Sequence, residues 1–136
     1  MLIAVIDGQG GGIGKIIIEK VRHEFHDSVE ILALGTNALA TAAMLRAGAN
    51  EGATGENALV GNVPNVDIIL GPLSIIMPRA MRGELTGKMA KKIVASDARK
   101  ILLPIHRNNI DIVGIKTEPL PHLVDAMVQQ LKQYLV

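Results

Sequence analysis

The sequence predicts an α/β fold of three layers, in which helices cover both faces of a mostly parallel sheet of about five strands. Two observations lead to this prediction. Short apolar runs that suit strands buried on both faces alternate with amphipathic segments that suit helices. The first apolar run is also followed directly by a glycine-rich loop and a helix. With 136 residues, the chain has room for one domain, residues 1–136.

Composition narrows the class of protein. Apolar residues make up 49% of the chain, but it holds one Phe, one Tyr and no Trp, so the core must be aliphatic. The formal net charge is +1, and no basic stripe or aromatic platform is present, which argues against nucleic-acid binding. Cysteine is absent, which excludes disulfides, thiolate metal sites and a cysteine nucleophile.

The mean hydropathy of +0.32 is high for a chain of this length. It indicates that apolar surface is buried against another subunit, and we expect a homo-oligomer, most simply a dimer. No apolar segment is long enough to span a bilayer, and the N-terminus lacks the basic region of a secretory signal. We therefore expect a cytoplasmic protein without a membrane partner.

The first predicted strand, residues 2–6, leads into a loop in which five of the seven residues 8–14 are glycine. A helix follows from about Gly14 to His26, so the loop amides lie at the positive end of a helix dipole. We expect these amides to hold the phosphate of a ligand; the alternative is a tight turn that needs glycine for packing alone. Asp7 is expected to orient the loop through its carboxylate. The predicted cofactor contacts in this loop are Gly8, Gln9, Gly10, Gly11, Gly12, Ile13, Gly14 and Lys15.

Two known nucleotide loops share parts of this pattern. The spacing Gly-x-x-x-Gly-Ile-Gly at residues 8–14 resembles the nucleotide loop of the short-chain dehydrogenase/reductase family, but that family's catalytic tyrosine–lysine pair has no counterpart, since the single Tyr134 precedes no lysine. Residues 11–15 resemble the Gly-Gly-x-Gly-Lys core of the partition-type ATPases, but Ile16 stands where a Mg²⁺-binding hydroxyl is needed. The loop therefore predicts nucleotide binding without either catalytic set.

A second buried strand, Val29 to Leu34, leads to Thr36 and Asn37, where a dinucleotide site usually places an acid that binds the ribose hydroxyls. No acid stands there. Thr36 and Asn37 are predicted to contact ribose or base instead, although Asn37 serves equally well as the N-cap of the next helix, Ala38 to Ala47.

The polar loop at residues 51–57 is a further candidate for ligand contacts, because such loops often carry function. The residues singled out are Glu51, Thr54, Glu56 and Asn57, and the two glutamates are also candidate catalytic bases. The alternative is a capped turn that leads into a short helix through Val60.

A third strand, Asp67 to Leu70, breaks at Gly71-Pro72. In a parallel sheet this end faces the same edge as the glycine loop, so Gly71 is included among the cofactor contacts. The pattern of residues 73–82 is ambiguous. Thr86 is predicted to cap a helix that runs to about Ser96.

Lys100 to Ile105 is predicted as a fourth strand and Ile110 to Ile115 as another. The four residues between them cannot form a parallel crossover, so we expect a hairpin with an antiparallel last strand. Its turn projects from the same edge as the glycine loop, which makes His106 and Arg107 candidates for anion contact or acid–base work; the alternative is an ordinary polar turn. An amphipathic helix, His122 to Leu135, closes the chain.

Several motifs together resemble an uncharacterised bacterial family of small glycine-rich α/β proteins. The similarity spans nearly the whole chain, implies a cytoplasmic location and brings no established activity. The motifs lie at residues 6–14, 34–38, 47–50, 52–58 and 119–121.

The sequence as a whole favours a Rossmann-like protein that binds a nucleotide or dinucleotide, with NAD(P) or another nucleotide as the phosphate-containing ligand. No metal site is predicted, because His23 and His26 have no supporting carboxylate cluster. Two alternatives remain: a small enzyme that acts on a phosphorylated metabolite, and a non-catalytic subunit that docks onto a partner protein.

Overall fold

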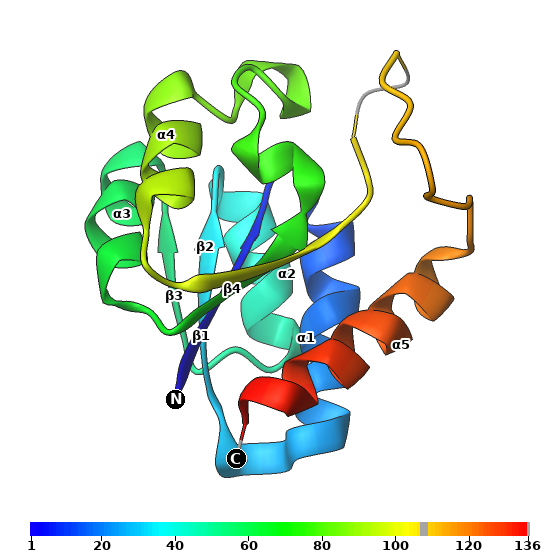
Figure 1. Cartoon of the computed structure of the whole chain (residues 1–136). Helices are drawn as coiled ribbons and strands as arrows, with labels where there is room; N and C mark the ends of the chain where they lie inside the picture. The colour runs from blue at the N-terminus through cyan, green and yellow to red at the C-terminus, as the bar shows by residue number, and fades with distance from the viewer. Residues whose placement is uncertain (107–108, 136) are drawn as a thin grey trace.

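A five-stranded sheet forms the middle layer of the molecule (Figure 1). The computed structural model describes residues 1–106 and 109–135. The strands are β1 (Leu2–Asp7), β2 (Glu30–Gly35), β3 (Glu51–Thr54), β4 (Ile68–Pro72) and β5 (Arg99–Leu103). They follow the order β3-β2-β1-β4-β5, and every pairing is parallel. The strand that precedes the glycine loop is therefore the central one.

Helices cover both faces of the sheet, as the alternation of side chains along β1 requires. Ile3 and Val5 pack into one aliphatic core, and Ala4 and Ile6 pack into a second core on the other face. The first core lies under α1 (Gly12–Phe25), α2 (Ala38–Ala47) and α5 (Leu120–Leu131), and the second under α3 (Glu56–Asn62) and α4 (Gly87–Ala95). This arrangement confirms the predicted three-layer α/β fold.

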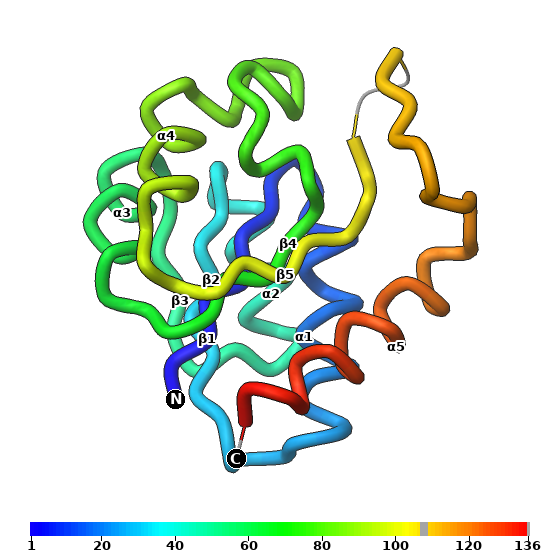
Figure 2. The backbone as a smooth tube through the Cα atoms, viewed as in Figure 1, coloured from blue at the N-terminus to red at the C-terminus, as the bar shows by residue number. Residues whose placement is uncertain are grey.

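Short 3₁₀ turns join several of these elements. They lie at His26–Ser28, Val63–Asn65, Leu73–Ile76, Met81–Gly83 and Lys132–Tyr134. The carboxyl ends of the strands and the glycine loop share one end of the molecule, and both termini lie at the opposite end (Figure 2).

The predicted antiparallel last strand is wrong. Residues 110–115 form no strand; they belong to an extended connection between β5 and α5. The segment is bent in its middle, because Gly114 has a φ of 88° and the N–H of Ile115 donates to the carbonyl of Ile112 at 3.2 Å. A bend of this kind prevents six residues from pairing as one straight strand. The fifth strand of the sheet is instead β3, which lies in the stretch predicted as a polar loop.

Other boundaries agree closely with the sequence. Helix α2 has the predicted ends, and Thr86 caps α4 by accepting a hydrogen bond from the N–H of Met89 at 3.1 Å. Helix α5 begins at Leu120, two residues before the predicted start, and its final turn is 3₁₀.

Candidate functional site

The order of the strands identifies one crevice at the carboxyl edge of the sheet. Strand β1 is followed by α1 on one face, whereas β4 is followed by 3₁₀ turns and α4 on the other face. Strands β1 and β4 are neighbours, and the chain leaves them toward opposite faces of the sheet. Their loops therefore separate. Open α/β sheets bind ligands at such a switch point. The glycine loop forms one wall of this crevice.

A buried carboxylate holds the glycine loop in place. Asp7 is 4% exposed; its Oδ1 accepts from the N–H of Gly8 at 2.8 Å, and its Oδ2 accepts from the N–H of Gly14 at 2.7 Å. Burial raises the pKa of Asp7, the amides of Gly14, Gly8 and Ile13 lower it, and the charge of Glu84 raises it further. The predicted role of Asp7 as the residue that orients the loop is therefore confirmed.

Most of the loop amides are already hydrogen-bonded within the chain. Besides Gly8 and Gly14, the N–H of Gly11 donates to the carbonyl of Gly8, and the N–H of Lys15 donates to the carbonyl of Gly11, both at 2.9 Å. Among the amides of residues 8–15, those of Gly10 and Gly12 have no hydrogen-bond partner in the described part of the chain. The amide of Ile13 faces the carboxylate of Asp7. A phosphate could therefore approach two amides rather than the whole series.

The loop glycines fall into two groups by the space around them. A Cβ on Gly8 would lie 2.6 Å from Met81 Sδ, one on Gly11 would lie 2.9 Å from the Ala40 backbone, and one on Gly14 would lie 2.5 Å from Met44 Sδ. A Cβ on Gly10 or Gly12 would meet nothing within 4 Å. Packing therefore accounts for the first group, and open space lies over the second.

The end of β2 lies beside this loop, as predicted. Asn37 has two functions: its Oδ1 caps α2 by accepting from the N–H of Ala40 at 2.8 Å, and its Nδ2 donates to the carbonyl of Gln9 at 2.9 Å. Thr36 donates its N–H to the carbonyl of Asp7 at 3.1 Å. The predicted helix cap is therefore confirmed, and the same side chain also joins the start of α2 to the glycine loop.

Glu84 is not among the predicted site residues, but it occupies the centre of this arrangement. Its Oε1 accepts three hydrogen bonds: from the N–H of Gln9 at 2.7 Å, from Thr36 Oγ1 at 2.7 Å and from Asn37 Nδ2 at 2.8 Å. The hydrogen bond from Thr36 is the largest of the effects that lower the pKa of Glu84, followed by the Gln9 amide. Glu84 is therefore a fixed anion at neutral pH, placed where β1 and β2 end.

An unusual backbone brings Glu84 to this position. Met81 and Arg82 have positive φ angles of 58° and 56°, and Gly83 follows at 91°. Left-handed conformations at residues other than glycine cost about 1 kcal/mol or more each. The next residue, Leu85, is fully buried, and Thr86 begins α4, so the chain is anchored directly after Glu84. Strain of this kind is found where the surrounding structure enforces a functional geometry.

Two hollows flank the glycine loop. One of about 210 Å³ lies at the switch point, and its walls include Asp7, Gln9, Ser74 and His106. The other, of about 450 Å³, lies between α1 and α2, and its lining residues are Gly10, Lys15, Glu19, Ala43, Arg46 and Ala47. The second hollow combines one of the open amides with two cationic side chains.

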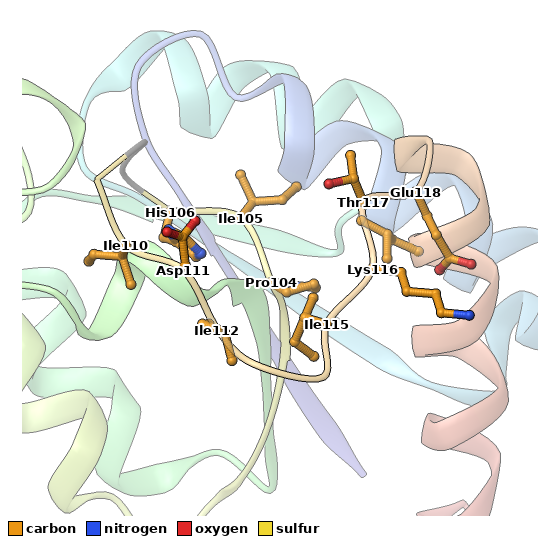
Figure 3. A pocket seen from close by; sticks show the side chains of 11 residues that line it. Pro104, Ile105, His106, Ile110, Asp111, Ile112, Ile115, Lys116, Thr117 and Glu118 are labelled. Carbon is orange, nitrogen blue, oxygen red and sulfur yellow. The ribbon is translucent and has the colours of Figure 1, made fainter.

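A third hollow, also of about 450 Å³, separates the end of β5 from the extended connection (Figure 3). Residues Pro104 to His106 line one side, and residues 110–112 and 115–118 line the other. Four of the exposed large apolar side chains of the described chain gather on this connection: Ile110, Ile112, Val113 and Ile115. Its described lining includes the candidate acid–base residue His106 and none of the predicted cofactor contacts.

Several predicted contacts have structural roles. Thr54 donates its hydroxyl to Thr41 Oγ1 at 2.8 Å, and Glu56 accepts from the Thr86 hydroxyl, which joins α3 to α4. Gly71 is buried in β4, where a Cβ would lie 2.7 Å from the carbonyl of Ile6. These three residues hold the fold together and line none of the hollows described above.

The remaining predicted residues differ in their placement. Glu51 and Asn57 are exposed, on β3 and α3, and neither lines a hollow beside the glycine loop. Ile13 lines the hollow at the switch point. Arg107 lies outside the described residues. Of the two described members of the predicted turn, His106 and Asn109, His106 lines the crevice.

Two features are absent from the residues that the structure describes. No helix among them is long and apolar enough to cross a membrane. Within the same ranges, no group of three or more His, Cys, Asp or Glu side chains has an arrangement that could hold a metal ion.

A doubly wound parallel sheet with a glycine loop at its switch point defines the class of Rossmann-like α/β proteins. The chain belongs to the family described as "Domain of unknown function (DUF3842)", whose family model matches residues 2–136. This match confirms the predicted membership of a family without an assigned activity. No curated protein and no solved structure matches the chain.

Proposed function

We propose that this protein binds a nucleotide or a dinucleotide, such as NAD(P), at the carboxyl edge of its sheet. The phosphate lies over the amides of Gly10 and Gly12, and the sugar lies toward the end of β2. The observation that carries this proposal is the hollow in which the open Gly10 amide meets Lys15 and Arg46 beside the helix N-terminus.

The position of the hollow supports a phosphate rather than another anion. Lys15 lies in the first turn of α1 and Arg46 in the last turn of α2, so two cations line the hollow together with one carboxylate, that of Glu19. A phosphate can accept hydrogen bonds from both amides and from the guanidinium at once. The ligand can then continue across Gly10 and Gln9 toward the hollow at the switch point.

The expected affinity is modest. Two charge-assisted hydrogen bonds contribute about 3–6 kcal/mol, which corresponds to dissociation constants near the millimolar range before the sugar and base add their contacts. A screen should therefore extend to about 10 mM ligand, where a Kd of 0.1 mM would stabilise the protein by about 2.7 kcal/mol.

The first experiment is a thermal-shift screen with NAD, NADP, ATP, GTP, FMN and sugar phosphates. At least one nucleotide is expected to raise the Tm in proportion to the logarithm of its concentration. If no nucleotide stabilises the protein, the proposal fails.

The second experiment places the ligand at the loop. Gly12→Val and Gly10→Val are expected to fold, because a Cβ at either position meets open space, and to lose the ligand-dependent shift. Gly61→Val is the matched control, since a Cβ there also meets nothing within 4 Å and Gly61 lies in α3, away from the loop. A ligand that binds Gly12→Val and Gly10→Val unchanged does not sit on the loop.

The cations can be tested in the same way. The double variant Lys15→Gln/Arg46→Gln is expected to weaken binding about tenfold or more. Lys91→Gln/Lys92→Gln, on the exposed face of α4, is the matched control for a loss of two charges. Equal weakening in both double variants would indicate a general charge effect rather than a phosphate site.

An enzyme that acts on a phosphorylated metabolite is a second candidate. Asp7, whose pKa is raised, lines the same hollow as Ser74 and His106, and groups with perturbed pKa values often mark acid–base sites. A metabolite that stabilises the protein should then be converted, and His106→Gln should abolish that conversion.

The proposal also includes a cytoplasmic homo-oligomer, most simply a dimer. The exposed Ile110, Ile112, Val113 and Ile115 support self-association, because isolated surfaces rarely gather apolar side chains in this way. Light scattering after size exclusion is expected to give a mass about twice that of the chain. Ile112→Lys/Ile115→Lys should return the protein to a monomer, and a monomeric wild type would contradict this part of the proposal.

A further inference from the structure

We infer that Glu84 is the residue that binds the ribose hydroxyls of the ligand, and that it selects nucleotides with free 2′- and 3′-hydroxyls over 2′-phosphorylated ones. This inference rests on the proposed nucleotide-binding function. In dinucleotide sites, an acid at the end of β2 usually binds the ribose hydroxyls. Here that role is assigned to Glu84, in the segment that follows β4.

The two oxygens of Glu84 have different surroundings. Oε1 accepts hydrogen bonds from Gln9, Thr36 and Asn37, which fixes the plane of the carboxylate. Oε2 accepts no hydrogen bond from the described residues, and the side chain is only partly buried. A carboxylate oxygen is an acceptor without a donor, so Oε2 is suited to ligand hydroxyls and not to ligand carbonyls or phosphates.

The position of Glu84 agrees with a sugar that follows a phosphate. Glu84 contacts the amide of Gln9, and the next amide along the chain is the open one of Gly10. Thr36 and Asn37, which hold Glu84, are the residues at the end of β2. The carboxylate thus lies between the proposed phosphate position and the end of β2, where the ribose is expected.

An alternative is that Glu84 blocks the site and a phosphate displaces it. Displacement would break three hydrogen bonds to an ionised carboxylate, each worth about tenfold or more in an equilibrium constant. A preorganised acceptor needs no such displacement, so the geometry favours recognition of the sugar.

The predicted specificity follows from charge. A 2′-phosphate would bring a second anion against Glu84, whereas a 2′-hydroxyl donates to it. Removal of the 2′-hydroxyl leaves one donor fewer for the carboxylate. The protein should therefore bind NAD about tenfold or more tightly than NADP, and ATP several-fold more tightly than 2′-deoxy-ATP.

The test is calorimetric titration of the wild type with NAD, NADP, ATP and 2′-deoxy-ATP, repeated with Glu84→Gln. The variant keeps the size of the side chain and removes its charge, so both affinity ratios should fall toward about one. Glu56→Gln is the matched control, because Glu56 is also a partly buried carboxylate that accepts from a threonine hydroxyl, and its ratios should stay at the wild-type values.

Each outcome decides between the possibilities. Equal affinities for NAD and NADP in the wild type overturn the inference without any need for a variant, and so do unchanged ratios in Glu84→Gln. Tighter binding of every nucleotide by Glu84→Gln would show that the residue blocks the site. If none of the four compounds binds the wild type, the proposed function itself fails, and this inference fails with it.

Discussion

Two carboxylates reach the same glycine loop from different parts of the chain, and they differ in almost every physical respect. Asp7 is buried at the end of β1 and accepts backbone N–H groups of the loop, and burial raises its pKa. Glu84 is partly exposed and accepts side-chain donors as well as one backbone N–H, and these hydrogen bonds lower its pKa. Two carboxyl groups whose environments shift their pKa values in opposite directions usually have different roles. We interpret Asp7 as the residue that shapes the loop and Glu84 as the one that meets the ligand.

The largest expected effect comes from the buried carboxylate. Asp7→Asn replaces one acceptor oxygen with an NH₂ group that faces a backbone donor, and it leaves a buried amide of the loop unpaired. We expect the free energy of unfolding to fall by about 3 kcal/mol, as measured by urea denaturation. A loss below about 0.5 kcal/mol would show that the loop keeps its shape without this carboxylate.

The glycines give the next largest difference. Gly14→Ala places a Cβ 2.5 Å from Met44 Sδ and 3.0 Å from Asp7 Cβ, so it should destabilise the protein by about 1–3 kcal/mol. Gly12→Ala adds a Cβ in open space at the start of α1 and should be neutral or stabilising by up to about 1 kcal/mol. Equal losses for both variants in the same urea titrations would contradict the division of the loop into packed and open glycines.

The smallest effect concerns Glu84 and is best measured against pH. Glu84→Gln should reduce the free energy of unfolding at neutral pH by about 1 kcal/mol, because water can take over its exposed donors. A lowered pKa means that the folded state binds fewer protons than the unfolded state, so the stabilisation by Glu84 is lost as the pH falls through its folded pKa. The difference between wild type and variant should grow with pH in the acidic range and become constant above the ordinary pKa of a glutamate.

Asp7 should show the opposite sign. Its pKa is raised in the folded state, so its contribution to stability falls as the pH rises from its ordinary pKa to its folded one. The stability difference between wild type and Asp7→Asn should therefore shrink over that range. Urea denaturation at several pH values measures both residues, and parallel pH curves for the two variants would refute the contrast between them.

The regular parts of this fold could be predicted because their signals are local. Strands β1, β2 and β4 are short apolar runs buried on both faces, and α2 lies between a side-chain cap at Asn37 and a glycine at position 48. The role of Asp7 was also accessible, since a carboxylate beside a helix N-terminus meets amide donors.

Two errors in the fold came from patterns that tertiary contacts override. Strand β3 consists of Glu51, Gly52, Ala53 and Thr54, none of which suggests a buried strand. Gly52 is needed there because a Cβ would lie 2.8 Å from Thr41 Cγ2 on α2. Residues 110–115 have the β-branched composition of a strand, but they do not pair, because the chain bends at Gly114.

Glu84 was missed for a different reason. Its position depends on left-handed conformations at Met81 and Arg82, which are residue types that rarely adopt them. One signal was available: the stretch after β4 had to meet the glycine loop if β4 lay next to β1. An acid in that stretch was therefore a candidate for the position that lacked one at the end of β2.

The side chain of Asn37 links the start of α2 to the proposed ligand site through hydrogen bonds. Its oxygen holds the first turn of the helix, and its nitrogen holds Gln9 and Glu84. A ligand that binds to Glu84 should also change the environment of the Asn37 amide group, because the two side chains share a hydrogen bond. The two side-chain NH₂ protons of Asn37 should thus give a resolved NMR signal that shifts on saturation of the site, and amide exchange in the first turn of α2 should slow at the same ligand concentration.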